Sequence, residues 1–325
     1  MIKLREASLA GANWLQTNLS VASFLCATLT GRIIAASHGM GIWYSDDDGL
    51  SWIQSNKTDG AFYAVCVTPT GRLIAVNSNN GGIWYSDDNG VNWTQSNKTN
   101  GYWRSLCVTQ TGRIIAGAIN STYGIWYSDD NGVNWVQSNI TTKQWFTLCV
   151  TSTGRILAGS NSSGAGGLYF SDDDGETWTH IPSVNYWYSL SITSTGKIIA
   201  SNYAGIQSSD DNGMTWTSLT ASNKAPDNRE WSMSCVTPTG RIIANSYNGS
   251  VWYSDDNGLN WVQTDKSAYE DTPFYVTPTG RVLLGGIWYS DSFSAKNARE
   301  KYLDQNGAQE LVTQFKAYCD NLVGA

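Results

Sequence analysis

The sequence predicts an all-β fold built from seven copies of one four-stranded unit, and three observations support this prediction. First, the segment 41–52 occurs in six full copies, and a truncated seventh copy lies at residues 286–291. Second, a Thr-Gly-Arg tripeptide (Thr-Gly-Lys in one unit) occurs seven times, with glycines separated by 40, 41, 42, 42, 44 and 40 residues. Third, the last unit lacks its final strand, and a segment near the N-terminus matches the missing one. A period of about 42 residues is typical of propeller blades, so we expect a seven-bladed β-propeller.

Each unit carries the signals of four short strands, as the second unit illustrates. Residues 64–68 and 73–76 are apolar runs separated by the Thr-Gly-Arg turn. Residues 83–86 have the pattern of a third strand, and residues 93–96 that of a fourth, with an acidic turn between them. Asp and Gly favour turns because Asp hydrogen-bonds nearby backbone and Gly adopts positive φ. The first two strands are apolar on both faces, as expected for strands between stacked sheets.

The two ends of the repeat array complement each other. The seventh unit ends after its third strand, at Asp291. Residues 13–17 (Asn-Trp-Leu-Gln-Thr) match residues 260–264 (Asn-Trp-Val-Gln-Thr), the fourth strand of the sixth unit. We therefore expect the N-terminal strand to complete the last blade, which removes the exposed edges of an open array. Residues 1–291 form the predicted propeller domain, and residues 292–325 form a separate tail.

The acidic turn between the third and fourth strands has a fixed spacing. In the first unit, Ser45, Asp47 and Gly49 precede Trp52 in the pattern Ser-x-Asp-x-Gly-x-x-Trp. This pattern resembles the Asp box, also called the BNR repeat, of sialidase-like β-propellers. The resemblance implies the propeller fold and a structural role for the central aspartates. These are Asp47, Asp88, Asp130, Asp173, Asp211 and Asp256.

Neither a metal nor a cofactor is predicted from these turns. An EF-hand calcium loop needs an acidic residue five positions before its glycine and a glutamate six positions after it. Tyr44 and Ser55 occupy those positions relative to Gly49, so the calcium-loop pattern is absent. The sequence also has no Cys-x-x-Cys pair that would indicate a zinc site.

Composition and charge argue against a nucleic-acid or membrane-spanning protein and favour a reducing compartment. The 325-residue chain has a formal net charge of −7 and a pI near 4.8, which argues against a nucleic-acid surface. It contains no run of about 18 apolar residues, so no membrane span is expected. No signal-peptide core follows Met1. Five of the six cysteines share one repeat position, where disulfide geometry between blades is not expected. We therefore expect reduced thiols and synthesis in a reducing cytoplasm.

Residues 292–325 leave the repeat pattern. From Ala308, apolar residues recur with helical spacing at Leu311, Val312, Phe315, Tyr318, Cys319 and Leu322. The sequence thus predicts a short C-terminal α-helical tail. Residues 303–307, followed by Leu311 and Phe315, resemble C-terminal segments of bacteriophage tail and other phage structural proteins. The resemblance implies attachment to other particle proteins or assembly of a homo-oligomer, and a helix that merely packs on the propeller is the alternative.

Loop lengths divide the predicted propeller into two faces. The Thr-Gly turns and the acidic turns share one face, here called the turn face, and their spacing is constant in every unit. The connections between the second and third strands and between successive units share the opposite face, here called the loop face, which holds all the length variation. Because variable loops carry function, we expect the ligand site on the loop face. On the turn face we expect one Arg–Asp contact per blade rather than a charged binding ring.

Two aromatic positions recur on the loop face. One begins the innermost strand, at Phe62, Trp103, Trp145, Trp187 and Trp231. The other lies on the third strand, at Trp43, Trp84, Trp126, Tyr169, Trp252 and Trp288. Flat aromatic faces can stack on sugar rings, and filling of the wedge between blades is the alternative for both positions.

The connection from Trp216 to Cys235 is the longest of its kind. It ends in Arg229, Glu230 and Trp231, which combine charged groups with an aromatic platform, and Trp187 and Tyr188 would form the opposite wall. The predicted ligand-binding residues are therefore Phe62, Trp103, Trp145, Trp187, Tyr188, Arg229, Glu230 and Trp231.

Enzymatic activity is not favoured, and no catalytic residue is predicted. The sialidase resemblance implies three arginines for a substrate carboxylate, a Tyr–Glu pair, an Asp and an Arg-Ile-Pro motif, and that motif is absent. Other glycoside hydrolases need two carboxylates that flank the scissile bond. The loop-face connections contain Glu230, Glu270 and Asp271, so such an activity stays possible. We predict a non-enzymatic propeller that binds a cell-surface glycan or receptor, with a phage tail or particle surface as its setting. The alternatives are a glycoside hydrolase on a degenerate sialidase-like scaffold and a structural or protein-binding propeller.

Overall fold

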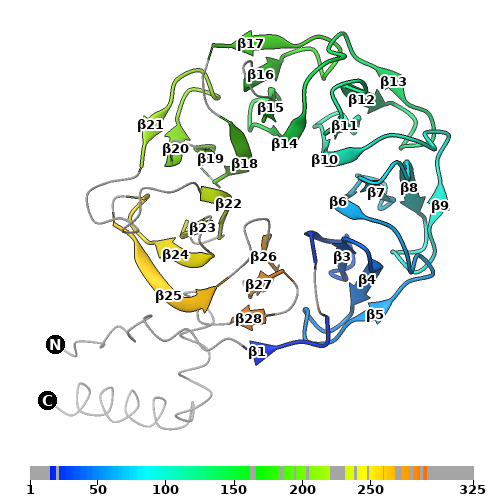
Figure 1. The fold of residues 1–325 in the computed structure, drawn as a ribbon, viewed down its shortest axis with the longest axis horizontal. Helices are drawn as coiled ribbons and strands as arrows, with labels where there is room; N and C mark the ends of the chain where they lie inside the picture. The colour runs from blue at the N-terminus through cyan, green and yellow to red at the C-terminus, as the bar shows by residue number, and fades with distance from the viewer. Residues whose placement is uncertain are drawn as a thin grey trace, which may run out of the picture.

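The chain folds as an all-β propeller. The computed structural model describes residues 15–290 except 20–21, 162–165, 183–185, 194, 203–204, 220–230, 238–239, 247–248, 259, 268–272, 278–280 and 286–287. The described strands form seven four-stranded sheets, each corresponding to one sequence repeat. Figure 1 shows them around a central axis. The secondary structure assigned to the described residues contains no helix, and the predicted helical tail at 292–325 lies outside them.

The sheets are called blades 1 to 7 here, and each runs from its innermost to its outermost strand. Blade 1 consists of β2 (Phe24–Ala27), β3 (Ile33–Ser37), β4 (Gly41–Ser45) and β5 (Ile53–Gln54). Blade 2 consists of β6 (Phe62–Val67), β7 (Leu73–Asn77), β8 (Ile83–Ser86) and β9 (Thr94–Gln95). Blade 3 consists of β10 (Trp103–Val108), β11 (Ile114–Ala118), β12 (Ile125–Ser128) and β13 (Val136–Gln137). Blade 4 consists of β14 (Trp145–Val150), β15 (Ile156–Ser160), β16 (Gly167–Ser171) and β17 (Thr179–Ile181).

The remaining blades follow the same plan. Blade 5 consists of β18 (Trp187–Ile192), β19 (Ile198–Asn202), β20 (Gly205–Ser209) and β21 (Thr217–Ser218). Blade 6 consists of β22 (Trp231–Val236), β23 (Ile242–Ser246), β24 (Ser250–Ser254) and β25 (Val262–Ser267). Blade 7 consists of β26 (Phe274–Val276), β27 (Val282–Leu284), β28 (Trp288–Ser290) and β1 (Leu15–Gln16).

Blade 7 joins the two ends of the repeat array. Strand β1 pairs antiparallel with β28, with Leu15 opposite Tyr289 and Gln16 opposite Trp288. The chain after β1 then docks on blade 1, where the Asn18 side chain donates to the Trp52 carbonyl (3.1 Å) and accepts from the Trp52 N–H (2.8 Å). The first strand therefore links the last blade to the first, as the matching ends predict. Trp14, which motivated that prediction, lies outside the described residues.

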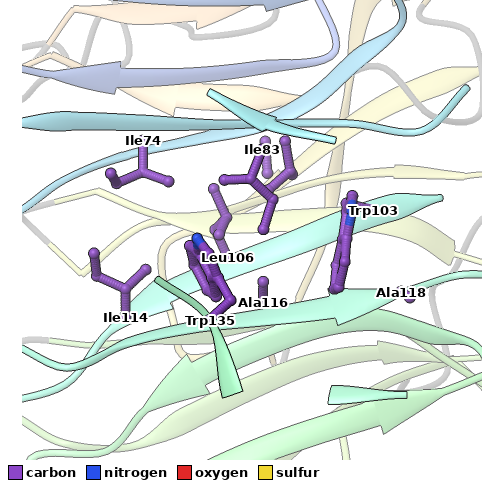
Figure 2. Close-up of a cluster of buried hydrophobic side chains, with 10 residues drawn as sticks. Ile74, Ile83, Trp103, Leu106, Ile114, Ala116, Ala118 and Trp135 are labelled. Carbon is purple, nitrogen blue, oxygen red and sulfur yellow. The ribbon is translucent and has the colours of Figure 1, made fainter. Parts of the chain in front are cut away.

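The core lies between neighbouring blades. The second strands β3, β7, β11, β15, β19 and β23 are buried at every position. Figure 2 shows one interface, in which Ile74 and Ile83 of blade 2 face Trp103, Leu106 and Trp135 of blade 3. Burial of both faces of each sheet explains why the first two strands of every unit lack the alternating pattern of a half-exposed strand.

The acidic turns are closed by their own serine and aspartate. In blade 2 the Ser86 hydroxyl donates to Asp88 Oδ1 (2.9 Å) and accepts from the Gly90 N–H (3.0 Å). Asp88 also accepts from the backbone (2.8 Å) and the side chain (2.6 Å) of Asn92. Asn89 and Gly90 have φ values of 62° and 87°, a left-handed conformation that Asn and Gly tolerate best. The same serine-to-aspartate bond occurs at Asp47, Asp130, Asp173, Asp211 and Asp256.

These hydrogen bonds stabilise the ionised aspartates. The side-chain and backbone hydrogen bonds from Thr215 lower the pKa of Asp211 to about 2. At Asp88 burial acts in the opposite direction, but the bonds from Asn92 and Ser86 outweigh it and leave the pKa lowered. Each carboxylate is an acceptor that organises a turn.

The tripeptide arginines tie the turn face together. Arg32 makes a bidentate contact with Asp46 of its own blade (2.6 and 2.8 Å) and donates to the Asn89 carbonyl of the next blade (3.2 Å). The Asn89 amide in turn donates to Thr30 (2.9 Å). Arg281 of blade 7 reaches the Asp48 carbonyl of blade 1 in the same way (3.1 Å). The expected Arg–Asp contact is thus extended by a link between blades.

The described cysteines are free thiols, namely Cys26, Cys66, Cys107, Cys149 and Cys235. Burial raises the pKa of Cys66 to about 12, which keeps this thiol protonated at neutral pH. Cys319 lies outside the described residues. Among the residues that the structure describes, none forms a helix with the length and hydropathy needed to cross a membrane.

Candidate ligand-binding site

The aromatic residues that begin the innermost strands are core residues. Phe62, Trp103, Trp145, Trp187 and Trp231 have exposed fractions of at most 4%. Each belongs to a cluster formed between two blades. A Cβ added to Gly117 would lie 2.8 Å from the Cβ of Trp145, which shows how closely this side chain packs on the preceding blade. The expectation that these five rings offer a face to a ligand is therefore corrected, because they fill the wedge between blades.

Three other predicted site residues have different outcomes. Arg229 and Glu230 lie outside the described residues. Tyr188 is partly buried and lines a cavity on the propeller axis. It directly follows the buried Trp187, and this relation between neighbours recurs in other blades.

A β-bulge separates the buried aromatic residue from its neighbour. In blade 3, Trp103 pairs with Ala118 and Ser105 with Gly117, so Arg104 is an extra residue on β10. The same register shift occurs after Phe62, Trp145, Trp187 and Trp231. A bulge re-aims a side chain that a regular strand would point towards a neighbouring sheet. The residues at four of these bulges, Tyr63, Arg104, Phe146 and Tyr188, line the axial cavity.

The cavity receives residues from the innermost strand or its leading turn in every blade. Its volume is about 330 Å³, within the usual range for small-ligand sites. The bulged residues come from the loop-face end of β6, β10, β14 and β18, which lie on consecutive blades along one side of the axis in Figure 1. Ser23, Phe24, Met233, Pro273 and Phe274 line the opposite wall. The site is therefore asymmetric, because the bulged side chains, three aromatic rings and one guanidinium, lie on four consecutive blades.

The four bulged side chains form a continuous arc. The Arg104 guanidinium carbon lies 4.2 Å from the ring centroid of Phe146 and 5.0 Å from that of Tyr63. The Phe146 and Tyr188 centroids are 6.5 Å apart in an edge-to-face arrangement. At the other end, His38 meets Tyr63 edge-on with centroids 5.4 Å apart. Such contacts hold each planar group in place. They therefore reduce the side-chain conformational entropy that would be lost when a ligand binds.

Two of the described third-strand aromatic residues, Trp84 and Trp126, contact lysines from the connections between blades. Lys57 and Lys98 come from the connections that precede blades 2 and 3, and their amino groups lie 4.2 Å from the Trp84 ring and 3.6 Å from the Trp126 ring. The Trp84 N–H donates to the Gly81 carbonyl (2.9 Å). A ring covered by a lysine from a neighbouring segment has a structural function. Wedge filling by the second aromatic position is thus the better account at these blades.

The described lining of the cavity offers recognition groups rather than a reactive pair. It contains Arg104 as its charged side chain, together with hydroxyls and aromatic rings, and it contains no carboxylate. Cys235 also lines it, and burial raises the pKa of this thiol to about 12, so the nucleophilic thiolate is disfavoured. No group of three or more potential metal ligands occurs among the described residues. Glu270 and Asp271, like Glu230, lie outside them.

Comparisons with known proteins identify the fold but no family. No protein-family model matches the chain, and no curated protein matches it at a significant level. The extracellular domain of a putative one component system from B. thetaiotaomicron is similar in structure, with a TM-score of 0.68 and 14% identity over 86% of this chain. A GH74 enzyme from Niastella koreensis has a TM-score of 0.67 and 17% identity over 85% of this chain. Virginiamycin B lyase from Staphylococcus aureus has a TM-score of 0.67 and 9% identity over 85%.

These similarities establish the propeller fold alone, because all three identities are far below 25%. The chain spans 39% of the B. thetaiotaomicron domain, 53% of the Niastella enzyme and 97% of the lyase. The neighbours include enzymes and the extracellular domain of a one component system, and one fold can host many unrelated functions. The function must therefore be inferred from the site in this chain.

Proposed function

We propose that this chain is a non-enzymatic binding propeller whose carbohydrate or receptor ligand sits at the loop-face mouth of the axial cavity. The observation that carries this proposal is the arc of Tyr63, Arg104, Phe146 and Tyr188, which four bulges direct into one cavity. These four side chains are not needed to pack one blade on the next, because the buried aromatic residue before each of them already fills the wedge between blades. Partly exposed aromatic faces suit the apolar faces of sugar rings.

The neighbouring side chains support a polar ligand with an apolar face. Ser23, Ser189 and Ser234 contribute hydroxyl groups to the cavity wall. A few polar groups within an aromatic lining are the usual composition of a specific small-ligand site. A sugar matches this composition because it combines ring faces with hydroxyl groups.

The experiment is a glycan array probed with the purified protein, run beside a panel of fluorogenic glycosidase substrates. We expect glycan binding and no substrate turnover. Tyr188→Ala should weaken binding of the best array ligand at least about 10-fold, or about 1.4 kcal/mol. Tyr102→Ala is the matched control, because Tyr102 is partly buried near Tyr123 and does not line the cavity. Turnover of any substrate would instead favour a glycoside hydrolase, and equal binding by both variants would remove this mouth from the site.

The setting of the protein is a separate part of the proposal. The acidic turns belong, on this view, to the Asp-box type, and the tail at residues 292–325 attaches the propeller to a phage tail or another particle surface. The repeated Ser-x-Asp-x-Gly geometry supports the first point, and the helical pattern of the tail sequence supports the second. Replacement of Leu311 and Phe315 by Asp should then lower the oligomeric mass or block particle assembly. Unchanged mass by light scattering and unchanged assembly would favour a tail that only packs on its own propeller.

A further inference from the structure

We infer that the turn face carries a second binding site, in a crevice between blades 3, 4 and 5, and that this site takes a neutral, hydroxyl-rich small molecule such as a monosaccharide. The inference goes beyond the loop-face site proposed above, because the crevice lies on the opposite face and shares no described residue with the axial cavity.

The crevice is formed by the turns of three consecutive blades. Its volume is about 300 Å³, at the lower end of the usual range for small-ligand sites. Blades 3 and 4 contribute their tripeptide turns, and blades 4 and 5 contribute their acidic turns. The described lining consists of polar side chains and one glycine, without an aromatic or aliphatic side chain. A ligand held here must therefore be recognised by hydrogen bonds.

One arginine link between blades is missing at this crevice. Elsewhere on the turn face, Nη1 of the tripeptide arginine donates to a carbonyl of the next blade at 3.1 or 3.2 Å, as at Arg32, Arg72, Arg113 and Arg281. Arg155 keeps the bidentate contact with Asp172 (2.7 and 2.8 Å), but its Nη1 has no hydrogen-bond partner in the described part of the chain. A ligand oxygen can take the place of the missing carbonyl.

Asn212, from the next blade, also departs from the repeated scheme. The equivalent Asn131 donates its amide to the Thr70 hydroxyl (2.9 Å), whereas Asn212 accepts from the Thr153 hydroxyl (3.3 Å). The Asn212 Nδ2 thus has no partner among the described residues. Because a hydroxyl can both donate and accept, either orientation of this amide leaves one of its polar atoms for a ligand.

Gln110 adds an acceptor to the crevice. The equivalent residues of blades 1 and 2 are apolar, so this amide is outside the repeated pattern. Its Nε2 donates to the Ser152 carbonyl (3.1 Å). A Cβ added to Gly154 would lie 3.4 Å from its Oε1, which places this oxygen against the tripeptide turn of blade 4. The Gln110 Oε1 has no partner among the residues that the structure describes, and it complements the N–H donors of the two preceding paragraphs.

The charges around the crevice favour a neutral ligand. Asp172 is paired with Arg155 (2.7 Å), while Asp174 lies 3.8 Å from Nε of Arg113 and accepts from the Thr111 hydroxyl (2.5 Å). An anion would meet both carboxylates, and a cation would meet both guanidinium groups. The groups that remain are N–H donors and a carbonyl acceptor, and hydroxyl groups satisfy both kinds.

The test uses saturation-transfer NMR titrations of the purified full chain with glucose, galactose and mannose. Each is compared with its uronic acid and its 2-amino sugar, which carry a negative or a positive charge near neutral pH on the same ring. At least one neutral sugar should bind about 5-fold or more tightly than both of its charged analogues, because each charge meets a group of the same sign in the crevice.

Asn212→Asp locates the binding in the crevice, because it removes the N–H donors and adds a negative charge. The equivalent residues Asp48 and Asp174 have φ values of 59° and 60°, close to the 56° of Asn212, so the turn accommodates an aspartate. Binding of the neutral sugar should weaken at least about 5-fold. Asn131→Asp is the matched control, since it makes the same change outside the crevice and loses the bond to Thr70. It should bind as the unmodified protein does, and thermal melts should show that both variants fold.

Arg155→Lys is an independent second variant. Lys197 occupies the equivalent position in blade 5 and contacts Asp210 (3.0 Å), so a lysine can keep the pairing with Asp172 while the Nη1 donor is lost. This variant should also weaken the neutral sugar at least about 5-fold. Tyr188→Ala, which changes only the loop-face cavity, should leave binding in the crevice in place.

The outcomes separate this site from the proposed function. Unchanged binding of the neutral sugar in Asn212→Asp and Arg155→Lys, or binding that Tyr188→Ala alone abolishes, overturns the turn-face site and leaves the loop-face site intact. A uronic acid or amino sugar that binds as tightly as its neutral parent overturns the inferred ligand class. Failure of all three neutral sugars to bind overturns the whole inference, whereas failure of every array glycan to bind overturns the loop-face proposal.

Discussion

The turn face and the loop face of this propeller use the same residue types for different purposes. On the turn face, Arg32, Arg72 and Arg113 are each held by an aspartate of their own blade and by the backbone of the next blade. On the loop face, Arg104 has rings of the two adjacent blades on either side and lines a cavity. Phenylalanine is used on both faces as well. The guanidinium carbon of Arg155 lies 4.2 Å from the Phe170 ring centroid on the turn face, and that of Arg104 lies 4.2 Å from the Phe146 ring centroid on the loop face.

The difference shows that repetition marks structure and that its interruption marks the candidate site. Turn-face contacts recur from blade to blade because every blade must be linked to the next. The residues at the bulges change along the chain from tyrosine to arginine, phenylalanine and tyrosine, although the preceding buried aromatic position hardly changes. Packing needs therefore explain the constant position, and ligand recognition is our account of the variable one.

Opening the ring should have the largest effect. Deletion of residues 1–17 removes β1, leaves β28 without its outer partner and also removes the strand that leads into the Asn18 contact with blade 1. We expect a lower melting temperature and concentration-dependent association through the exposed edge. Calorimetry and light scattering measure these two effects. A monomeric protein with an unchanged melting temperature would contradict the role assigned to β1.

Neighbouring residues at one bulge should differ sharply in their effect on stability. Trp103→Ala should cost about 3–5 kcal/mol of unfolding free energy, because it empties a fully buried position between blades 2 and 3. Arg104→Ala should cost much less than Trp103→Ala, because its side chain borders a cavity. Denaturant titrations of both variants test the contrast. Equal losses would mean that the bulge does not separate packing from recognition.

An acidic turn should contribute an intermediate amount. Ser86→Ala removes the hydroxyl that bridges Asp88 and the Gly90 N–H, and Ser86 is itself buried. We expect a loss of about 1–3 kcal/mol, since Asp88 loses one of its donors and the Gly90 N–H loses its acceptor. Asp59→Ala is the control, because Asp59 lies outside these turns. Its effect should be small, since it removes only an exposed ion pair with Lys57. If the Ser86→Ala variant were as stable as the control, the hydrogen bonds of this turn would not contribute to the stability of the fold.

The pH dependence should be the smallest of these effects. The pKa of Asp211 is about 2 in the folded chain and about 3.8 as its ordinary value, so its contribution is fully present above about pH 4. That contribution should be lost as the pH falls from about 4 to 2, because protonation removes the acceptor for Thr215. Thermal melts of Asp211→Asn should show a shallower loss over this window than the unmodified protein. Identical pH profiles would show that the turn does not respond to this ionisation.

Much of the fold could be predicted from the sequence, whereas the lining of the cavity could not. The Thr-Gly and Ser-x-Asp-x-Gly spacings report local turn geometry, which depends on nearby residues such as Asp88 and Gly90. The match between residues 13–17 and 260–264 likewise predicted the place of β1. Which side chain faces the axis depends instead on a one-residue register shift that no local spacing reveals.

That register shift explains the error about the inner aromatic residues. Without a bulge, Trp103 and its counterparts were expected at the mouth of the cavity, where Arg104 and its counterparts lie instead. A signal for the correct residues was present in the chain. The residue after each buried aromatic residue varies between units in size and charge. Such variation next to a constant core position indicates a functional surface.

The central claim, that the ligand sits on the loop face at the bulged residues, is tested most directly with a pair of phenylalanines. Phe146 and Phe170 each stack on an arginine at 4.2 Å, but Phe146 lines the axial cavity and Phe170 stacks on the turn-face Arg155. A binding titration with the strongest glycan from the array should show that Phe146→Ala loses at least about 10-fold in affinity. Phe170→Ala, once shown to be folded, should bind as the unmodified protein does. Equal affinities for the two variants, or a larger loss in Phe170→Ala, would contradict the account.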